Sequence, residues 1–205
     1  MTLAIIETGC ANIVSVQAAL DRLGARQTLV RDPDEARDAA RLILPGVGSA
    51  GAAMGVLTAR GWADALHREE RPLLGICLGM QVLFEQSGEG DVACLGLLPG
   101  KVEKLSRPDG GVWPHMGWNQ LDFEPGRAPL LAGIDPGAYV YFVHGYAAPV
   151  CGSTVATCDY GQAFSAMVRR GAVMGCQFHP ERSSNIGSRI LHNFMSMSDE
   201  TLSSN

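Results

Sequence analysis

The sequence predicts an α/β fold with a central, mostly parallel sheet flanked by helices and an additional antiparallel sheet region. In the first half of the chain, short apolar runs alternate with segments of helical periodicity, which is typical of β-α-β units. In the second half, strand-like runs follow one another with Gly, Pro and Asp turns between them, which favours antiparallel pairing. A length of 205 residues suits one domain, which we place at residues 2–198, followed by a tail at 199–205.

The first half is expected to contain four strands and several helices. The strands cover residues 3–6, 28–30, 42–44 and 73–76. The helices cover residues 13–23, a segment that starts at 32–35, segments that run toward residue 70, and residues 78–84. Asn12 is suited to cap the first helix and Gly24 to end it. Pro33 and the acidic residues around it suit a helix start.

The second half is expected to contain six strands and one helix. The strands cover residues 101–105, 117–123, 138–143, 153–157, 164–169 and 173–177. The helix covers residues 184–197, because Ile186, Ile190 and Phe194 recur there at helical spacing. The chain beyond Ser198 is expected to fray.

Composition excludes several classes of protein. The chain is 46% hydrophobic with a net charge of −5, and Arg169-Arg170 is its longest basic run, so nucleic acid is not an expected partner. The apolar residues 3–6 are too few for a signal peptide or a membrane span, so we expect a cytoplasmic protein that does not bind membranes. No cysteine belongs to a Cys-x-x-Cys pair, so we expect reduced thiols, no metal and no cofactor. The cysteines are Cys10, Cys77, Cys94, Cys151, Cys158 and Cys176.

Cys77 ends a predicted buried strand and lies between Gly75 and Gly79. A strand, a tight turn with small neighbours, a reactive side chain and a helix form the pattern of a nucleophile elbow. The alternative is a core cysteine, since free cysteine commonly packs as a small hydrophobic residue.

His179 is the histidine best placed to serve as a base for such a nucleophile. Pro180 favours an extended backbone at His179, and residues two apart in an extended chain face the same side. Glu181 can therefore orient the imidazole. The alternative is a loop histidine next to an unrelated surface carboxylate.

The segments Gly75-Ile76-Cys77-Leu78-Gly79-Met80-Gln81 and Phe178-His179-Pro180-Glu181 together resemble the class I glutamine amidotransferases, and the resemblance covers essentially the whole chain. It implies the fold of that family and a reaction in which a cysteine attacks the side-chain amide of glutamine. Ammonia leaves, and water then releases glutamate from a thioester. Carried over, Cys77 is the nucleophile, His179 the general acid and base, and Glu181 the orienting group.

The resemblance also implies the groups that hold the oxyanion and the substrate. The oxyanion hole would be formed by the backbone of Leu78, Val47 and Gly48. The substrate-binding residues would be Gly46, Gln81, Glu89, Gly145 and Tyr146. A nucleotide-binding function for the Gly46-Val47-Gly48 turn is a weaker alternative, because no further phosphate-binding motif follows it. Glu89 could also be a solvated loop carboxylate. Gly145 stands where the family often has Ser or Thr, so a hydroxyl contact would be absent.

Four further segments resemble one subgroup, the glutaminase subunits of imidazole glycerol phosphate synthases. They cover residues 7–12, 45–49, 114–119 and 141–146. The resemblance implies a role in histidine biosynthesis and a heterodimer with a (β/α)₈-barrel cyclase subunit that uses the ammonia. Expected partner contacts are Asn12, Trp118, Tyr141 and Arg182. Open alternatives are glutaminases for aminodeoxychorismate, anthranilate or pyridoxal phosphate synthesis, a catalytically inactive binding subunit, and a cysteine hydrolase of the peptidase or γ-glutamyl type.

Overall fold

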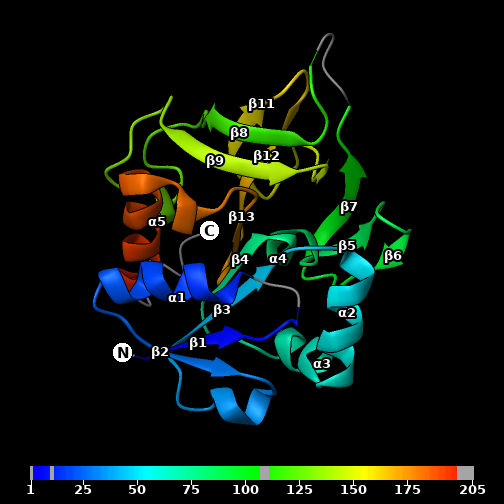
Figure 1. The fold of residues 1–205 in the computed structure, drawn as a ribbon, viewed down its shortest axis with the longest axis vertical. Helices are drawn as coiled ribbons and strands as arrows, with labels where there is room; N and C mark the ends of the chain where they lie inside the picture. The colour runs from blue at the N-terminus through cyan, green and yellow to red at the C-terminus, as the bar shows by residue number, and fades with distance from the viewer. Residues whose placement is uncertain (1, 10–11, 107–110, 198–205) are drawn as a thin grey trace.

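A seven-stranded sheet forms the centre of the computed structural model, which describes residues 2–9, 12–106 and 111–197 (Figure 1). Cys10, Ser198 and the predicted tail at 199–205 lie outside the described residues. The strands of this sheet are β1 (Thr2–Ile6), β2 (Arg26–Val30), β3 (Arg41–Gly46), β4 (Leu73–Cys77), β11 (Thr154–Asp159), β12 (Ala163–Arg170) and β13 (Val173–Cys176). Their order across the sheet is β11-β12-β13-β4-β3-β1-β2.

Two smaller sheets complete the strand structure. One contains β5 (Phe84–Ser87), β6 (Val92–Ala93), β7 (Leu98–Lys104) and β10 (Tyr146–Ala147). The other is a two-stranded antiparallel ribbon of β8 (His115–Gln120) and β9 (Tyr139–His144). The ribbon joins the large sheet region through a hydrogen bond from the His179 N–H to the Tyr141 carbonyl, 2.9 Å long.

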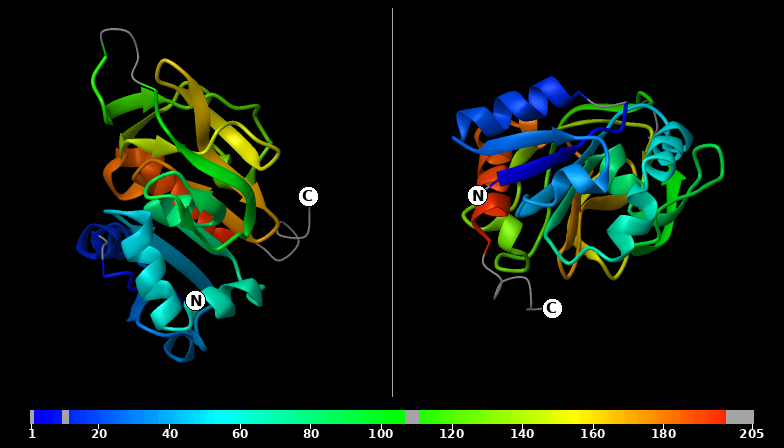
Figure 2. Two further views of the ribbon diagram at one scale, coloured as in Figure 1. Left: turned by 90° about the vertical axis from the view of Figure 1, so that its right-hand side faces the viewer. Right: turned by 90° about the horizontal axis from the view of Figure 1, so that it is seen from below.

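Helices cover both faces of the large sheet (Figure 2). They are α1 (Ile13–Arg22), α2 (Ala50–Ala59), α3 (Trp62–His67), α4 (Leu78–Gln81) and α5 (Ser184–Ser196), with 3₁₀ turns η1 (Pro33–Ala36), η2 (Pro129–Leu131) and η3 (Pro180–Arg182). Leu3 and Ile5 pack in one core with α1 and α5, whereas Ala4 and Ile6 pack in a second core with α2 and α3. This alternation follows from the two-residue period of a strand that is buried on both faces.

The predicted fold class is confirmed. Strands β2, β1, β3, β4 and β13 pair in parallel, and β12 and β11 extend the sheet in antiparallel register. Among the described residues, no helix has the length and apolar character needed to cross a membrane. The five described cysteines are all free thiols.

Two of the predicted helices differ from the structure, one in its length and one in its type. The helix predicted at 78–84 ends at Gln81, because the carbonyls of Val82, Leu83 and Phe84 accept hydrogen bonds from the chain at 95–98. The segment at 32–35 forms only the 3₁₀ turn η1, although Asp32 caps it by accepting hydrogen bonds from two backbone N–H groups. At 82–84, hydrogen bonds to a distant segment therefore override the local helix signal.

Other predictions differ in detail. Asn12 precedes α1 as expected, but its side chain makes no capping hydrogen bond. Gly24 does follow the helix in the left-handed conformation, with a φ of 70°. Strands β5, β6 and β10 were not predicted, and β8 begins earlier than the predicted 117–123. These strands are short or polar, so they lack the apolar runs from which strands are recognised.

Candidate active site

Cys77 lies on a strained turn at the end of β4, with φ 53° and ψ −112°. This region is unfavourable for a residue with a side chain, and it persists only where the surroundings enforce it. Here, close packing of the surrounding backbone holds Cys77 in this conformation. A Cβ atom added to Gly79 would lie 1.7 Å from the Leu44 carbonyl oxygen, and one added to Gly75 would lie 2.7 Å from the Gly79 carbonyl oxygen. The strand, turn and helix of the predicted elbow are therefore present, and its glycines are sterically required.

His179 reaches the same edge of the sheet because β13 pairs in parallel with β4. Parallel strands end together, so the residues that follow them meet at one edge. The His179 Nδ1 atom lies 2.8 Å from Glu181 Oε1, and the two side chains are only 6% and 1% exposed. His179 has the extended backbone predicted from Pro180, with φ −99° and ψ 98°. The residues that follow it form the 3₁₀ turn η3, because proline also suits the first position of such a turn, so the contact with Glu181 forms across that turn.

The electrostatics around His179 favour its protonated form. Burial by itself lowers the pKa of His179, but interaction with the Cys77 sulfur and with the Glu181 carboxylate outweighs burial and raises the pKa to about 10. Nδ1 donates to Glu181, while Nε2 has no hydrogen-bond partner among the described residues. An imidazolium beside a sulfur, with one N–H left over, is the arrangement of a thiol nucleophile with its acid and base.

A cavity of about 320 Å³ brings most of the predicted residues together. Its lining residues are Val47, Gly48, Cys77, Leu78, Gln81, Glu89, Val143, His144, Gly145, Tyr146 and His179. Glu181 and Gly46 do not line it. Glu181 lies behind His179, and Gly46 pairs with Cys77 in the ladder of β3 and β4, where an added Cβ atom would lie 3.0 Å from the Gly79 nitrogen.

Two polar side chains fix the walls of this cavity. The amide nitrogen of Gln81 donates to the Tyr146 carbonyl at 2.8 Å and to Gln177 Oε1 at 2.9 Å, so it joins α4 to two other segments. The Glu89 carboxylate accepts a hydrogen bond from the Ala50 N–H at the start of α2, 3.0 Å long. A carboxylate is favoured at the amino end of a helix, so Glu89 is held at the cavity and is not a freely solvated loop residue.

Three residues near Cys77 were not predicted. Gln177 Nε2 lies 3.8 Å from the Cys77 sulfur, and the sulfur lies 3.9 Å from the Val143 carbonyl. His144 lines the cavity beside them. Gln177 is two residues before His179, so the sequence offered a local signal for it. Val143 and His144 are brought there by the ribbon, and nothing in their local sequence indicates that pairing.

Comparisons with known proteins identify the family of this chain. The family model "Glutamine amidotransferase class-I" matches residues 4–197. The chain is 54% identical to imidazole glycerol phosphate synthase subunit HisH of Xanthomonas campestris pv. campestris, over 96% of this chain and 98% of that protein. It is 54% identical to the subunit of the same name from Xylella fastidiosa, over 95% and 96%. The chain belongs to the class I glutamine amidotransferase family.

Solved structures confirm the fold of this amidotransferase at low sequence identity. A glutamine amidotransferase crystal structure matches with a TM-score of 0.72 at 20% identity, over 98% of this chain and 99% of that one. The structure of PurLQS from Thermotoga maritima matches with a TM-score of 0.72 at 21% identity, over 95% and 97%. The predicted likeness to the family and to its imidazole glycerol phosphate synthase subgroup is thus confirmed.

A second buried histidine lies on the cavity of this amidotransferase. The Nδ1 atom of His144 lies 2.8 Å from the Tyr146 carbonyl, which can only accept, so Nδ1 carries the proton. Its Nε2 then accepts from Nδ1 of His115 at 3.1 Å, and Asn119 donates to the far side of His115 at 3.4 Å. Burial lowers the pKa of His144 to about 3 and that of His115 to about 4. This pair is therefore neutral, and His144 donates to the same Tyr146 carbonyl as Gln81.

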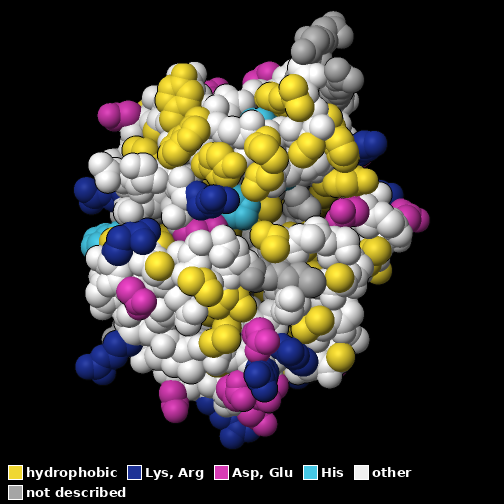
Figure 3. Space-filling view, in the orientation of Figure 1, with side chains coloured by type: hydrophobic (Ala, Val, Ile, Leu, Met, Phe, Trp, Pro, Cys, Tyr) yellow, Lys and Arg dark blue, Asp and Glu magenta, His cyan; other side chains and the backbone are white. Residues whose placement is uncertain are grey.

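Three of the four predicted partner contacts form one cluster. Trp118 is paired with Tyr141 across the ribbon, with ring centroids 6.0 Å apart, and the Arg182 guanidinium lies 5.3 Å from the centre of the Tyr141 ring. Asn12 belongs to a different element, at the exposed start of α1. The outward face of the ribbon also carries exposed Met116 and Tyr139. In Figure 3, hydrophobic side chains gather over this upper part of the face.

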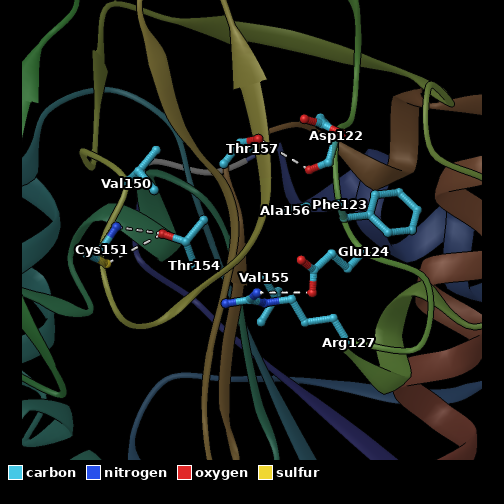
Figure 4. Close-up of a pocket in the computed structure, with 10 residues that line it drawn as sticks. All are labelled: Asp122, Phe123, Glu124, Arg127, Val150, Cys151, Thr154, Val155, Ala156 and Thr157. Carbon is cyan, nitrogen blue, oxygen red and sulfur yellow. Dashed lines mark hydrogen bonds and ion pairs between the residues drawn. The ribbon is translucent and has the colours of Figure 1, made fainter.

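A separate pocket of about 260 Å³ lies between β11 and the loop that follows β8 (Figure 4). It contains an ion pair between Arg127 and Glu124, with nitrogen and oxygen 3.7 Å apart, and a hydrogen bond from the Thr157 hydroxyl to the Asp122 carbonyl. None of the predicted site residues lines this pocket, so it does not belong to the amidotransferase site.

Proposed function

We propose that this chain is the glutaminase subunit of an imidazole glycerol phosphate synthase, which works in histidine biosynthesis. It hydrolyses glutamine to glutamate and ammonia and delivers the ammonia to a cyclase subunit. The observation that carries the reaction is the strained Cys77 on a cavity that also contains His179, with Glu181 bonded behind it. The pathway is supported by 54% identity to HisH subunits over nearly the full length of both chains.

Cys77 acts as the nucleophile. Its thiolate attacks the side-chain amide carbon of glutamine, a carbon–sulfur bond forms, and the carbonyl electrons move to oxygen. Protonated His179 donates its Nε2 proton to the amide nitrogen, the carbon–nitrogen bond breaks, and ammonia leaves behind a glutamyl thioester. Neutral His179 then takes a proton from water while the water oxygen attacks the thioester. The carbon–sulfur bond breaks, and glutamate and the thiolate are released. Glu181 keeps the ring oriented throughout.

The oxyanion of both steps is held by backbone donors. Leu78 follows Cys77 at the start of α4, so its N–H is one donor. The second comes from the turn of Val47 and Gly48, whose φ at Gly48 is 94°. Val47 lies on the rim of the cavity and is partly exposed. A reorientation of the peptide near Val47 would complete the hole, so glutamine hydrolysis by the isolated chain is expected to be slow until the partner binds.

Other residues that line the cavity hold the substrate glutamine. Glu89 binds the α-ammonium of glutamine, since a carboxylate is the natural partner of a cation. The backbone of Gly145 and Tyr146 lies along the other side, positioned by Gln81. Gly46 lets the end of β3 pack closely against Leu78 and Gly79 at the start of α4. We propose residues 2–198 as the single catalytic domain and the cytoplasm as its location.

The cyclase subunit, a (β/α)₈ barrel, docks on the ribbon to form a heterodimer. Trp118, Tyr141 and Arg182 combine two aromatic rings and an arginine, the residue types that dominate protein interfaces. Val143 belongs to the same outward row as Tyr141 and also lines the cavity. A partner that covers this face therefore lies next to the place where ammonia is released. Asn12 is proposed as a further contact from α1.

The test is Cys77→Ala in the complex with the cyclase subunit. Glutamine-dependent synthesis should fall by about 10⁴-fold or more, as for removal of a catalytic nucleophile. Synthesis supported by added ammonia should be unchanged, because the cyclase reaction does not use Cys77. Cys94→Ala serves as the control, since Cys94 is a free cysteine that does not line the cavity. Equal loss with glutamine and with ammonia would contradict the proposed division of labour.

A further inference from the structure

Trp113 packs directly against the backbone of Gly145. A Cβ atom added to Gly145 would lie 2.5 Å from Cζ2 of the Trp113 ring, far inside van der Waals contact. The indole therefore occupies the space into which any side chain at position 145 would project. Gly145 lines the Cys77 cavity, whereas Trp113 does not, so the ring supports this wall from behind.

Trp113 also holds the Gly145 peptide by a hydrogen bond. Its indole N–H donates to the Gly145 carbonyl at 3.2 Å, and the Leu105 N–H donates to the same oxygen at 2.9 Å. The next carbonyl, that of Tyr146, accepts from Gln81 and from His144. Both carbonyls of the two-residue wall are therefore bound by protein groups, which restricts rotation of these peptides.

The position of the indole is itself secured. The Lys104 ammonium lies 4.8 Å from the centre of the Trp113 ring, within the range of a cation–π interaction. Lys104 of β7 is paired with Tyr146 of β10. The lysine that contacts the indole therefore lies on the strand that pairs with this wall of the cavity. The ring is 41% exposed, so it can be substituted without opening the core.

We infer that Trp113 is a positioning residue for glutamine binding in this amidotransferase. Its indole ring fills the space that a side chain at position 145 would occupy. It also fixes the backbone of Gly145 and Tyr146, against which glutamine lies. Gly145 is then required for a steric reason, because any Cβ atom there displaces the indole and breaks its hydrogen bond. The inference rests on the proposed function only in taking this backbone as part of the glutamine site.

A double-mutant cycle tests the inference in the complex with the cyclase subunit. Trp113→Ala removes the support, and Gly145→Ala displaces it, so each should raise the KM for glutamine about five- to tenfold, within the range of single contact couplings. Because both changes break the same contact, the double variant should be no worse than the weaker-binding single variant. Trp113→Phe keeps the ring and removes the N–H, so it isolates the hydrogen bond and should give a smaller increase in KM.

Ammonia-dependent synthesis should be unchanged in all of these variants, because ammonia bypasses the glutamine site. Val112→Ala is the matched control, since Val112 is adjacent in sequence and highly exposed and does not line the cavity. Calorimetric binding of glutamine to Cys77→Ala, with and without Trp113→Ala, should show the same loss of affinity in the absence of turnover.

Three results would overturn the inference: an unchanged KM in Trp113→Ala, effects of the two single changes that multiply in the double variant, or an equal loss of ammonia-dependent synthesis. These are distinct from failure of the proposed function. If the wild-type complex turns over glutamine and Cys77→Ala does not, an unchanged KM counts against Trp113 alone.

Discussion

Two strand ends meet at the cavity, and each supplies a buried histidine with an opposite pKa shift. His179 follows β13, and its pKa is raised to about 10, whereas His144 ends β9, and its pKa is lowered to about 3. Burial lowers the pKa in both cases, so burial does not distinguish them. The difference lies in the partners of each ring. The Cys77 sulfur and the Glu181 carboxylate both raise the pKa of His179, whereas His144 has only the neutral Tyr146 carbonyl to offset its burial.

The β13 end and the β9 end of the cavity therefore have different tasks. In the proposed reaction, the β13 end places a proton donor next to Cys77, because the negative charge of Glu181 behind the ring helps to stabilise the imidazolium. The β9 end uses a neutral imidazole as a fixed donor and acceptor, and it joins the ribbon to the glutamine wall through His115 and Tyr146. One cavity thus has a reactive side built by the large sheet and a supporting side built by the ribbon.

The largest expected effect comes from removing the Glu181 carboxylate, which is bonded to His179. Glu181→Gln removes the charge and allows the wrong ring nitrogen to be protonated, so kcat with glutamine should fall by roughly 10³- to 10⁴-fold, as for the equivalent change in a Ser-His-Asp triad. Steady-state kinetics of the complex measure it. The pKa of His179 should also fall, because one of the two interactions that raise it is lost. Ammonia-dependent synthesis is the control, and a loss of less than tenfold in kcat would mean that Glu181 does not orient the base.

The two histidines should also affect stability in opposite pH ranges. The pKa of His144 in the folded protein lies below its unfolded value near 6.5. His144 therefore does not lower the stability of the fold above pH 6.5 and lowers it increasingly as pH falls toward 3. His144→Gln keeps a donor and an acceptor but cannot titrate. Between pH 6.5 and 4.5 the wild type should therefore lose about 2 kcal/mol more unfolding free energy than this variant, at about 1.4 kcal/mol per pH unit.

His179 provides the opposite case. The pKa of His179 in the folded protein lies above its unfolded value. Its contribution to the stability of the fold is therefore fully present below pH 6.5 and is lost as pH rises through about 10. The stability difference between the wild type and His179→Gln should therefore shrink from pH 6 to pH 10. Urea denaturation at pH 4.5, 6.5 and 10 measures both variants. The same pH dependence in the two variants would contradict the contrast between the regions.

The reactive side of the cavity was largely predictable from the sequence, and the supporting side was not. Cys77, His179 and Glu181 occur in short motifs whose glycines and proline dictate the backbone locally. The fold class followed for the same reason, since β-α-β alternation is a local pattern. In contrast, Val143 and Trp113 reach the site through strand pairing and packing between distant segments. The prediction of a helix over 78–84 was wrong for the same reason, because long-range hydrogen bonds determine where this helix ends.

The smallest effect is expected on the outer face of the ribbon, where a change should alter partner binding and leave the chemistry intact. Trp118 is 52% exposed and packs edge-on against Tyr141, which Arg182 covers. Trp118→Ala should weaken affinity for the cyclase subunit by at least about tenfold, as for an aromatic interface residue. Titration calorimetry measures the affinity, and kcat at saturating cyclase subunit should stay within about twofold because Trp118 does not line the cavity.

Leu29→Ala is the matched control for that variant, because Leu29 is an exposed apolar residue on β2, the strand at the opposite edge of the large sheet. It should leave partner affinity unchanged. If both variants bind the cyclase subunit as tightly as the wild type, the partner docks elsewhere, and the ribbon serves only to support the glutamine wall. If Trp118→Ala instead lowers kcat at saturation, the outer face of the ribbon acts on the chemistry, and the division between a reactive and a supporting side does not hold.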